Sequence, residues 1–314
     1  MVVFGGHSNI VHIYKAEQFH PSRQYLSPTN LVKIIKTKND LIAETLKTAD
    51  KGLSTLVPTM GALHDGHLEL IRHARKLSGT NGCVIVSLFV NPSQFDRIED
   101  LDNYPRTIDQ DLKKCQAEGV DIVFAPDPAS MYQPNHSVTV IENSLATRLC
   151  GAARPGHFNG VCTIVLKLFN LCRADIAVFG KKDYQQLAII RRMIRDLNVQ
   201  IRIEAIDTVR DTNGVALSSR NALLTPEQYN DASRIRRALL AAKKCHIAGE
   251  TSVAQLVEIE SNSIQISEQG AQIDYLEILD ADSLEPIKSV NRPAIMATAV
   301  FYGKVRLIDN IELG

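Results

Sequence analysis

Short apolar runs alternate with stretches of helical periodicity over about the first 200 residues. Runs of strand length, rich in β-branched residues, occur at 53–57, 83–90, 120–124 and 175–179. Apolar residues recur at helical spacing over 30–51, 67–78, 107–118, 159–172 and 183–197. Continuously apolar strands that alternate with helices are typical of a parallel sheet covered on both faces. The pattern predicts an α/β domain with a doubly wound parallel sheet of the Rossmann type.

The pattern changes after residue 206. Two stretches of helical periodicity are followed by three alternating, strand-like stretches, at 226–247, 251–268, 272–280, 294–302 and 305–309. Helices followed by strands joined by turns predict a smaller α+β domain. The beginning of the chain has few periodic apolar positions and is interpreted as an extension. We therefore expect three parts: an N-terminal extension at 1–26, a Rossmann-like domain at 27–206 and an α+β domain at 207–314.

Composition excludes several classes of protein. Lys plus Arg and Asp plus Glu number 35 each, so the net charge is zero, whereas a duplex-binding protein carries a basic surplus. The best candidate for a membrane span, 161–172, is short and interrupted by Lys167, and the N-terminus lacks a secretory pattern. The six cysteines form no Cys-x-x-Cys and no paired Cys/His spacing, which favours reduced thiols and argues against zinc. We expect a soluble, cytoplasmic protein that binds neither nucleic acid nor membranes.

The first candidates for chemistry are the residues after each predicted strand, because open α/β sheets bind ligands beyond the carboxyl ends of their strands. After the first strand come two glycines, Gly61 and Gly66, and two histidines, His64 and His67, at the start of a helix. Glycine allows close backbone approach, a helix N-terminus offers free amides to an anion, and both imidazoles could reach one phosphate. A metal-binding histidine pair and two surface histidines stay open as alternatives. Neither G-x-G-x-x-G nor the P-loop pattern occurs.

Two later strand ends are also polar. Asn91 and Gln94 follow the second strand and suit hydrogen bonds to an uncharged or carboxylate group, although a polar turn set by Pro92 has the same pattern. Lys182 follows the fourth strand and can act as a point charge for phosphate, with Asp183 at the next helix start. Solvated lysines are the alternative there.

Two turns carry further candidates. Ser218, Ser219 and Arg220 place two hydroxyls and a guanidinium in a row, which can clamp a polyphosphate but is also a common turn sequence. Arg154 and His157 flank a rigid turn that precedes a helix.

Taken together, these residues resemble the nucleotidyl-transferase superfamily that includes the class I aminoacyl-tRNA synthetases, whose HxGH element is matched here by residues 64–67. Within it, the chain is closely similar to the pantothenate synthetases, the pantoate–β-alanine ligases. The resemblance covers about residues 30–312, in order. It is carried by the strings VPTMGALHDGH (57–67), FVNPSQF (89–95), NYPRT (103–107), RPGHF (154–158), FGKKDYQQL (179–187), LSSRN (217–221) and RLIDN (306–310).

The resemblance implies a two-step ligase in which 27–206 binds ATP and pantoate and 207–314 acts as a lid. Pantoate and ATP give an enzyme-bound pantoyl adenylate and pyrophosphate, and β-alanine then displaces AMP to form pantothenate. The implied ATP site consists of Met60, Gly61, Ala62, Leu63, His64, Asp65, Gly66, His67, Gly180, Lys181, Lys182, Asp183, Val209, Leu217, Ser218, Ser219 and Arg220.

The implied catalytic groups supply positive charge where negative charge develops, with His67 in the position of proton donor. Together with a magnesium ion they are His64, His67, Lys182, Ser218, Ser219 and Arg220. The implied groups for pantoate and β-alanine include two amides that both donate and accept. They are Gln94 and Gln186, with Asn91, Tyr104 and Arg154 lining or closing the pocket. Asp111 is the candidate metal ligand, and relatives commonly form homodimers, which we expect here.

The chain departs from the family pattern at three positions. Cys150 stands where some relatives carry Glu, and Gln110 replaces an acid beside Asp111. Lys181 replaces an acidic residue and is expected to add positive charge to the ATP site. Three other functions stay open: a nucleotidyltransferase acting on another phosphorylated small molecule, a catalytically silent nucleotide-binding protein, and an RNA-binding relative of the synthetases.

Overall fold

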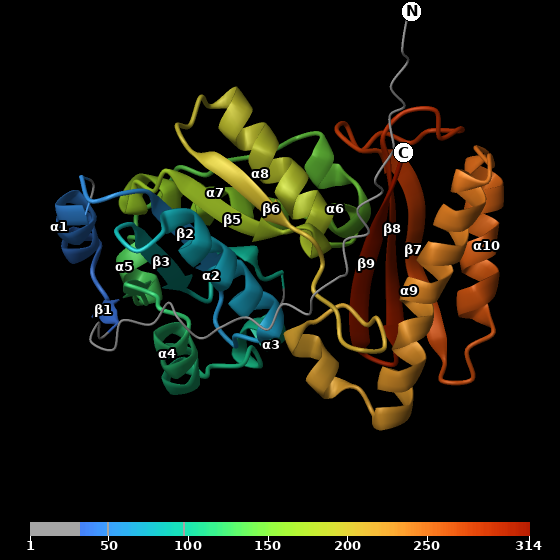
Figure 1. Ribbon diagram of the computed structural model, residues 1–314, viewed down its shortest axis with the longest axis horizontal. Coiled ribbons are helices and arrows are strands. Elements are labelled where there is room, and N and C mark those ends of the chain that lie inside the picture. Colours follow the sequence, from blue (N-terminus) through green and yellow to red (C-terminus); the bar gives the residue numbers. More distant parts are fainter. Residues whose placement is uncertain (1–31, 49, 97) are drawn as a thin grey trace, which may run out of the picture.

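The computed structural model describes residues 32–48, 50–96 and 98–314. Within them the first part of the chain forms a six-stranded sheet in the order β1-β4-β3-β2-β5-β6, and every neighbouring pair is parallel (Figure 1). The strands are β1 (Lys33–Ile35), β2 (Ser54–Thr59), β3 (Cys83–Leu88), β4 (Ile122–Phe124), β5 (Ile176–Gly180) and β6 (Arg202–Ile206). The predicted doubly wound parallel sheet is confirmed.

Helices cover both faces of this sheet. They are α1 (Lys38–Thr48), α2 (Asp65–Ser78), α3 (Ile98–Asp102), α4 (Ile108–Ala117), α5 (Pro128–Met131), α6 (Leu149–Ala153), α7 (His157–Cys172) and α8 (Tyr184–Asp196). Short 3₁₀ turns are η1 (Pro92–Gln94), η2 (Leu145–Thr147), η3 (Lys181–Asp183) and η4 (Ser219–Leu223). No helix in the described ranges is long and apolar enough to cross a lipid bilayer.

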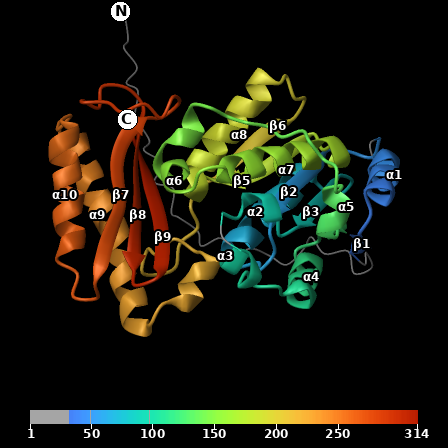
Figure 2. The same ribbon diagram turned by 180° about the vertical axis from the view of Figure 1, so that it is seen from behind.

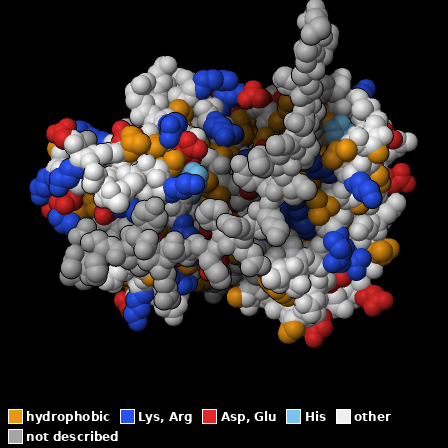
Figure 3. Space-filling model, viewed as in Figure 1, with side chains coloured by type: hydrophobic (Ala, Val, Ile, Leu, Met, Phe, Trp, Pro, Cys, Tyr) orange, Lys and Arg blue, Asp and Glu red, His pale blue; other side chains and the backbone are white. Residues whose placement is uncertain are grey.

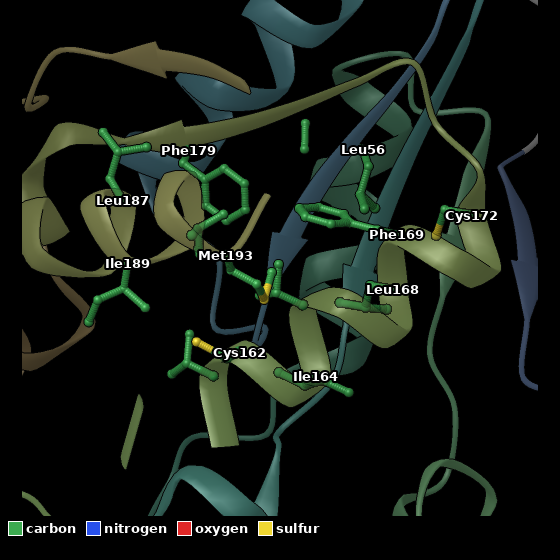
Figure 4. Packing of buried hydrophobic residues seen from close by; sticks show 14 of the residues in the cluster. Leu56, Cys162, Ile164, Leu168, Phe169, Cys172, Phe179, Leu187, Ile189 and Met193 are labelled. Atoms are coloured by element: carbon green, nitrogen blue, oxygen red, sulfur yellow. The ribbon is translucent and has the colours of Figure 1, made fainter. Parts of the chain in front are cut away.

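Alternate residues of the central strands enter two different cores. Leu56 of β2 packs with α7 and α8, among side chains such as Phe169 and Met193 (Figure 4). The next residue, Val57, packs in the other cluster with Ile71 of α2. This two-sided burial explains why the central strands carry consecutive apolar residues, since the residues of both faces leave water.

The C-terminal part is a three-stranded antiparallel sheet with two helices (Figures 1 and 2). One face of the sheet packs against both helices, and the other contributes Leu279, Ile295 and Ala297 to a core shared with the parallel-sheet unit. The elements are α9 (Pro226–Ile247), α10 (Val253–Gln265), β7 (Ala271–Asp280), β8 (Ala294–Tyr302) and β9 (Val305–Leu313). Because an apolar cluster crosses from one unit to the other, the division into 27–206 and 207–314 stays a prediction.

Two expected elements need correction. The helix expected over 30–51 begins at Lys38, where Thr37 and Asp40 exchange hydrogen bonds across its first turn. The preceding β1 instead pairs with β4, so tertiary pairing overrides the helical periodicity there. The strand expected over 120–124 starts only at Ile122, and β6 was not expected at all. The extension predicted at 1–26 lies outside the described residues.

Candidate active site

The site lies where the sheet changes its winding direction. β2 and β5 are parallel neighbours, and the chain runs from β2 toward β3 on one side and from β5 toward β6 on the other. The loop after β2 and the η3 turn after β5 therefore leave the same edge of the sheet side by side. Such a switch point is where open α/β sheets bind their ligands.

Helix α4 holds the loop after β2. Gly61 and Ala62 have left-handed backbone angles, with φ of 82° and 50°. The Asp111 carboxylate accepts hydrogen bonds from the amides of Ala62 at 2.9 Å and Leu63 at 2.8 Å. Lys114, one turn further along α4, donates to the carbonyl of Leu63. Helix α4 thus holds the loop both through its backbone amides and through a backbone carbonyl.

His64 and His67 cap the N-terminus of α2 and are fixed by backbone amides. The Gly66 amide donates to Nδ1 of His64 at 3.1 Å, and the His64 amide donates to Nδ1 of His67 at 3.3 Å. A ring nitrogen that accepts carries no proton, so in the neutral ring the hydrogen is on Nε2 of each residue. A side chain at Gly66 would bring its Cβ within 2.9 Å of the His64 ring. The two imidazoles therefore present two Nε2–H donors.

Both imidazoles are neutral in the free site. Burial, with the charge of Lys182, lowers the pKa of His64 to about 4. Burial, with His64 and Lys182 nearby, lowers the pKa of His67 to about 3. The ring centroids are 4.1 Å apart, so two cations would also repel each other. Without ligand the two histidines are therefore hydrogen-bond donors rather than cations, and the charge that they are expected to supply during the reaction stays a prediction.

The η3 turn carries two lysines in different environments. Lys181 pairs with Asp207 at 2.9 Å and Glu312 at 3.3 Å, and these contacts, that to Asp207 first, raise its pKa. Its charge is thus paired with two exposed carboxylates, and the contribution that Lys181 is expected to make to the ATP site stays a prediction. The Nζ atom of Lys182 instead lies 3.7 Å from a carboxylate oxygen of Asp183, and its positive charge helps to lower the pKa of both histidines.

The Ser218–Arg220 turn approaches the same place from the C-terminal part. The Leu217 amide donates to the carbonyl of Val209 at 3.0 Å, which closes the hairpin leading into the turn. A Cβ at Gly66 would lie 3.7 Å from Leu217 Cβ, so the hairpin passes close to the start of α2. Ser218 caps η4 by accepting from the amide of Arg220 at 3.3 Å. The structure thus brings the turn beside the histidine pair.

Gln94 is held in place from three sides. Its Oε1 accepts from Nδ2 of Asn91 at 3.1 Å, and its Nε2 donates to the sulfur of Met60 at 2.9 Å. Its carbonyl accepts from Arg154 at 3.1 Å and from Nδ1 of His157 at 2.7 Å. The contact to Met60 connects Gln94 directly to the loop after β2. Asn91, Arg154 and His157 therefore orient Gln94.

Three comparisons with known proteins agree with this geometry. The family model for pantoate-beta-alanine ligase matches residues 32–312. The chain belongs to the pantoate–β-alanine ligase family. It is 51% identical to a pantothenate synthetase of Akkermansia muciniphila over 90% of this chain and 100% of that protein. Over 90% of this chain it is 42% identical to all of one from Thermotoga neapolitana.

Solved structures of the family share the fold. The pantothenate synthetase of Thermus thermophilus matches with a TM-score of 0.83 at 38% identity, over 89% of this chain and 99% of that one. A pantoate-beta-alanine ligase from Francisella tularensis matches with a TM-score of 0.72 at 30% identity, over 89% and 97%. That structure is described as a complex with β,γ-ATP and β-alanine.

The other residues that are expected to bind the substrates of this ligase differ in how far their side chains are already engaged within the protein. Gln186 is partly buried and makes no side-chain hydrogen bond within the described part of the chain, so its amide is available. The neighbouring Gln185 is buried and donates to the carbonyls of Leu145 at 2.8 Å and Arg148 at 2.6 Å. Tyr104 packs edge-on against Phe95, with centroids 5.7 Å apart. Burial raises the pKa of Tyr104, and the nearby charge of Arg220 opposes that shift.

The described residues do not fit a metal ion held by the protein. They contain no group of three or more His, Cys, Asp or Glu side chains placed to bind one. Asp111, the candidate ligand, is 2% exposed and also accepts from the hydroxyl of Thr107 at 3.1 Å. Its oxygens are thus engaged in holding the loop after β2.

Cys150 is a residue of α6 and contacts the C-terminal sheet of the enzyme. Its sulfur is 3.4 Å from the hydroxyl of Tyr275 and accepts from Arg306 at 3.4 Å. Arg306 also pairs with Asp274 at 2.7 Å. A carboxylate at position 150, as some relatives carry, would therefore meet an arginine.

Sequence reasoning missed the residues that hold the site rather than line it. Lys114 carried no recognisable signal, because it acts on a loop far away in sequence, and Thr107, which donates to Asp111, was visible only within the string NYPRT. His157 was noted only as part of a turn, although it fixes Gln94. Asn310 was visible only within the string RLIDN, with no role attached.

Proposed function

We propose that the enzyme condenses pantoate with β-alanine to pantothenate and converts ATP to AMP and pyrophosphate. The observation that carries this proposal is the meeting, at one switch point, of two Nε2–H donors, Lys182 and a hydroxyl-guanidinium turn. Gln94, whose amide contacts Met60 of the same loop, adds a site for an uncharged or carboxylate group beside them.

In the first half-reaction, a carboxylate oxygen of pantoate attacks the α-phosphorus of ATP. The bond between that phosphorus and the bridging oxygen breaks, and pyrophosphate leaves with the electron pair. Donors aimed at the phosphoryl oxygens stabilise the charge that develops there. We assign this work to the Nε2–H groups of His64 and His67, with Lys182 as the cation and Ser218, Ser219 and Arg220 on the departing phosphates.

In the second half-reaction, the amine nitrogen of β-alanine attacks the acyl carbon of pantoyl adenylate. The bond from that carbon to the phosphate oxygen breaks, AMP leaves, and the nitrogen loses its proton to solvent. Gln94 and Gln186 offer both donor and acceptor atoms for the hydroxyl and carboxylate groups of the substrates. We assign Asn91 and Arg154 to orienting Gln94, and Tyr104 to the wall of the pocket.

An acyl adenylate has to be kept from water. We propose that the part of the chain after residue 206 acts as a lid, with the Ser218–Arg220 turn as its edge over the phosphates. The proximity of Leu217 to Gly66 supports this arrangement.

Magnesium enters this proposal only as part of the substrate. Mg²⁺ is commonly bound by phosphates and water with few protein ligands, which agrees with the absence of a ligand cluster in the described residues. We further propose a cytoplasmic homodimer. The six free cysteines fit a reducing compartment, and Val138 and Ile141, 81% and 56% exposed, are apolar side chains that a second copy could cover.

The surface argues for small substrates rather than RNA. On the coloured part of the face in Figure 3, basic and acidic side chains are interspersed. Such a surface exerts little long-range attraction on a phosphate backbone, which fits the zero net charge.

One incubation tests the proposal. Purified protein is mixed with ATP, Mg²⁺ and pantoate without β-alanine, and pantoyl adenylate is sought by mass spectrometry. We expect the adenylate and pyrophosphate, and conversion to pantothenate and AMP once β-alanine is added. Folded protein that adenylates another carboxylate, or transfers a nucleotide to a phosphorylated substrate but not to pantoate, would overturn the substrate assignment.

A further inference from the structure

Two adjacent residues of β9, Asp309 and Asn310, contact the lysine turn of the site and the hairpin that leads into the Ser218–Arg220 turn. They are 5% and 8% exposed, and they come from the C-terminal sheet rather than from either turn. Successive side chains of a strand point to opposite faces, so the two residues reach in different directions.

Asn310 holds the backbone of the lysine turn. Its Nδ2 donates to the carbonyl of Lys181 at 3.0 Å and to the carbonyl of Lys182 at 2.9 Å. Only a primary amide or a cationic side chain offers two hydrogens from one nitrogen, and an amide does so without adding charge beside Lys182. These two bonds join the C-terminal sheet to η3 of the parallel-sheet unit.

Asp309 holds the other turn through Arg210. Its carboxylate accepts hydrogen bonds from both Nη atoms of Arg210, at 2.6 and 2.7 Å, in a bidentate ion pair that is largely buried. Arg210 also donates to the carbonyl of Gly214 at 3.0 Å, inside the hairpin that leads to Ser218. The carboxylate further accepts from the amide of Asn310 at 2.8 Å. Bidentate, charge-assisted pairs of this kind are strong and geometrically specific.

We infer that Asp309 and Asn310 are positioning residues that set the spacing between Lys182 and the Ser218–Arg220 turn. The lysine turn and the hairpin that leads into the Ser218–Arg220 turn are anchored to neighbouring positions of one strand, so the spacing between the two turns depends on these bonds. A polyphosphate bound between the two turns would contact the charges of Lys182 and Arg220 in positions that are already set. The inference rests on the proposed function, because it assumes that ATP phosphates lie between the two turns.

The test compares Asn310→Ala with a matched variant of the same strand, Glu312→Gln. Glu312 contacts the same turn through the Lys181 side chain, but it does not hold the turn's backbone. Pyrophosphate release is measured with ATP and pantoate varied separately, alongside circular dichroism and thermal unfolding. We expect Asn310→Ala to raise KM for ATP at least tenfold and to change KM for pantoate less than twofold. Glu312→Gln should leave both within twofold.

Two further variants make the test decisive. Asn310→Ser keeps one donor and should therefore raise KM for ATP by less than Asn310→Ala does. If Asn310→Ala does not fold, Asn310→Ser takes its place in the test. Asp309→Asn should raise KM for ATP as well. A variant that only loses folded protein would lower kcat without moving KM for ATP, and that result would overturn the inference, as would an unchanged KM.

Binding of a non-hydrolysable ATP analogue, measured by calorimetry, separates this inference from the proposed function. If the unmodified enzyme makes no pantoyl adenylate but Asn310→Ala still weakens the analogue at least tenfold, the proposed reaction fails and the positioning role stands. Equal analogue affinity in the unmodified enzyme and the variant overturns the positioning role.

Discussion

Asp111→Asn separates a loop-holding carboxylate from a metal ligand at the same position. The substitution keeps the size of the side chain but replaces one acceptor oxygen with an NH₂ group. In the structure the two oxygens accept from the amides of Ala62 and Leu63. Either orientation of the new amide therefore points a donor at a backbone donor, and the negative charge is lost from both bonds.

The magnitude follows from these two bonds. Hydrogen bonds to a charged group contribute about 1.5–3 kcal/mol each. Losing one and weakening the other should cost about 2–4 kcal/mol, which reduces kcat/KM for ATP by about 30- to 1000-fold if the loop must be ordered for adenylation. The left-handed Ala62 makes the loop sensitive, because that backbone conformation is unfavourable without such support.

The assay is pyrophosphate release at several concentrations of free Mg²⁺. We expect the loss in kcat/KM to be the same at every concentration, because Asp111 acts on the backbone of the loop. The matched control is Asp109→Asn, which removes the same charge from an exposed position in the first turn of α4. Recovery of Asp111→Asn at high Mg²⁺ or Mn²⁺ would refute this reasoning in favour of a metal ligand, and so would full activity at all concentrations.

Four further predictions concern single side chains. His67→Ala should slow single-turnover adenylation about a hundredfold or more, as loss of one charge-stabilising donor does; unchanged adenylation would remove His67 from the mechanism. In ¹⁵N NMR of the free enzyme, His64 and His67 should stay neutral at pH 5, because their pKa values are about 4 and about 3; a midpoint near 6.5 would contradict the burial argument. Gln94→Ala should raise KM for pantoate far more than KM for ATP, and equal increases would reassign the residue. Burial favours the neutral carboxyl of Glu260 and raises its pKa to about 8. The stability that this neutral form contributes to the folded protein is fully present below about pH 4.5 and is lost as pH rises through 8. Glu260→Gln should therefore increase the free energy of unfolding by up to about 3 kcal/mol at pH 7, and denaturation curves with no gain at that pH would disprove this.

The strands that sequence reasoning found differ physically from those it missed. β2 and β3 are buried on both faces, so apolar residues such as Leu56 and Val57 follow one another directly along the strand. β1 and β6 are the two edges of the sheet and are partly exposed along their length. They carry charged residues such as Lys33, Arg202 and Glu204, which interrupt any apolar run. Their pairing depends on a neighbour that the local sequence does not reveal.

The site divides in the same way. The groups that we propose to face the ligand, such as His64, His67 and Lys182, stand in local strings after strands and are visible in the chain alone. The groups that orient them belong to other elements: Asp111 and Lys114 act from α4 on the loop after β2, and Asn310 acts from β9 on η3. No local pattern contains these pairs, since each contact joins segments about 50 or more residues apart.

The charge state of the histidines was also beyond sequence reasoning, and it changes how the site works. Two imidazoles whose rings are 4.1 Å apart beside Lys182 would incur both desolvation and mutual repulsion if they were cations. As neutral donors with backbone-fixed tautomers they avoid both penalties, and in the proposed mechanism their Nε2–H bonds would strengthen as negative charge accumulates on the phosphoryl oxygens. We therefore propose that Lys182 and Arg220 supply the charge of the site, while the histidines supply direction. A bound triphosphate would raise both histidine pKa values, so ATP binding itself should shift these donors toward the protonated state.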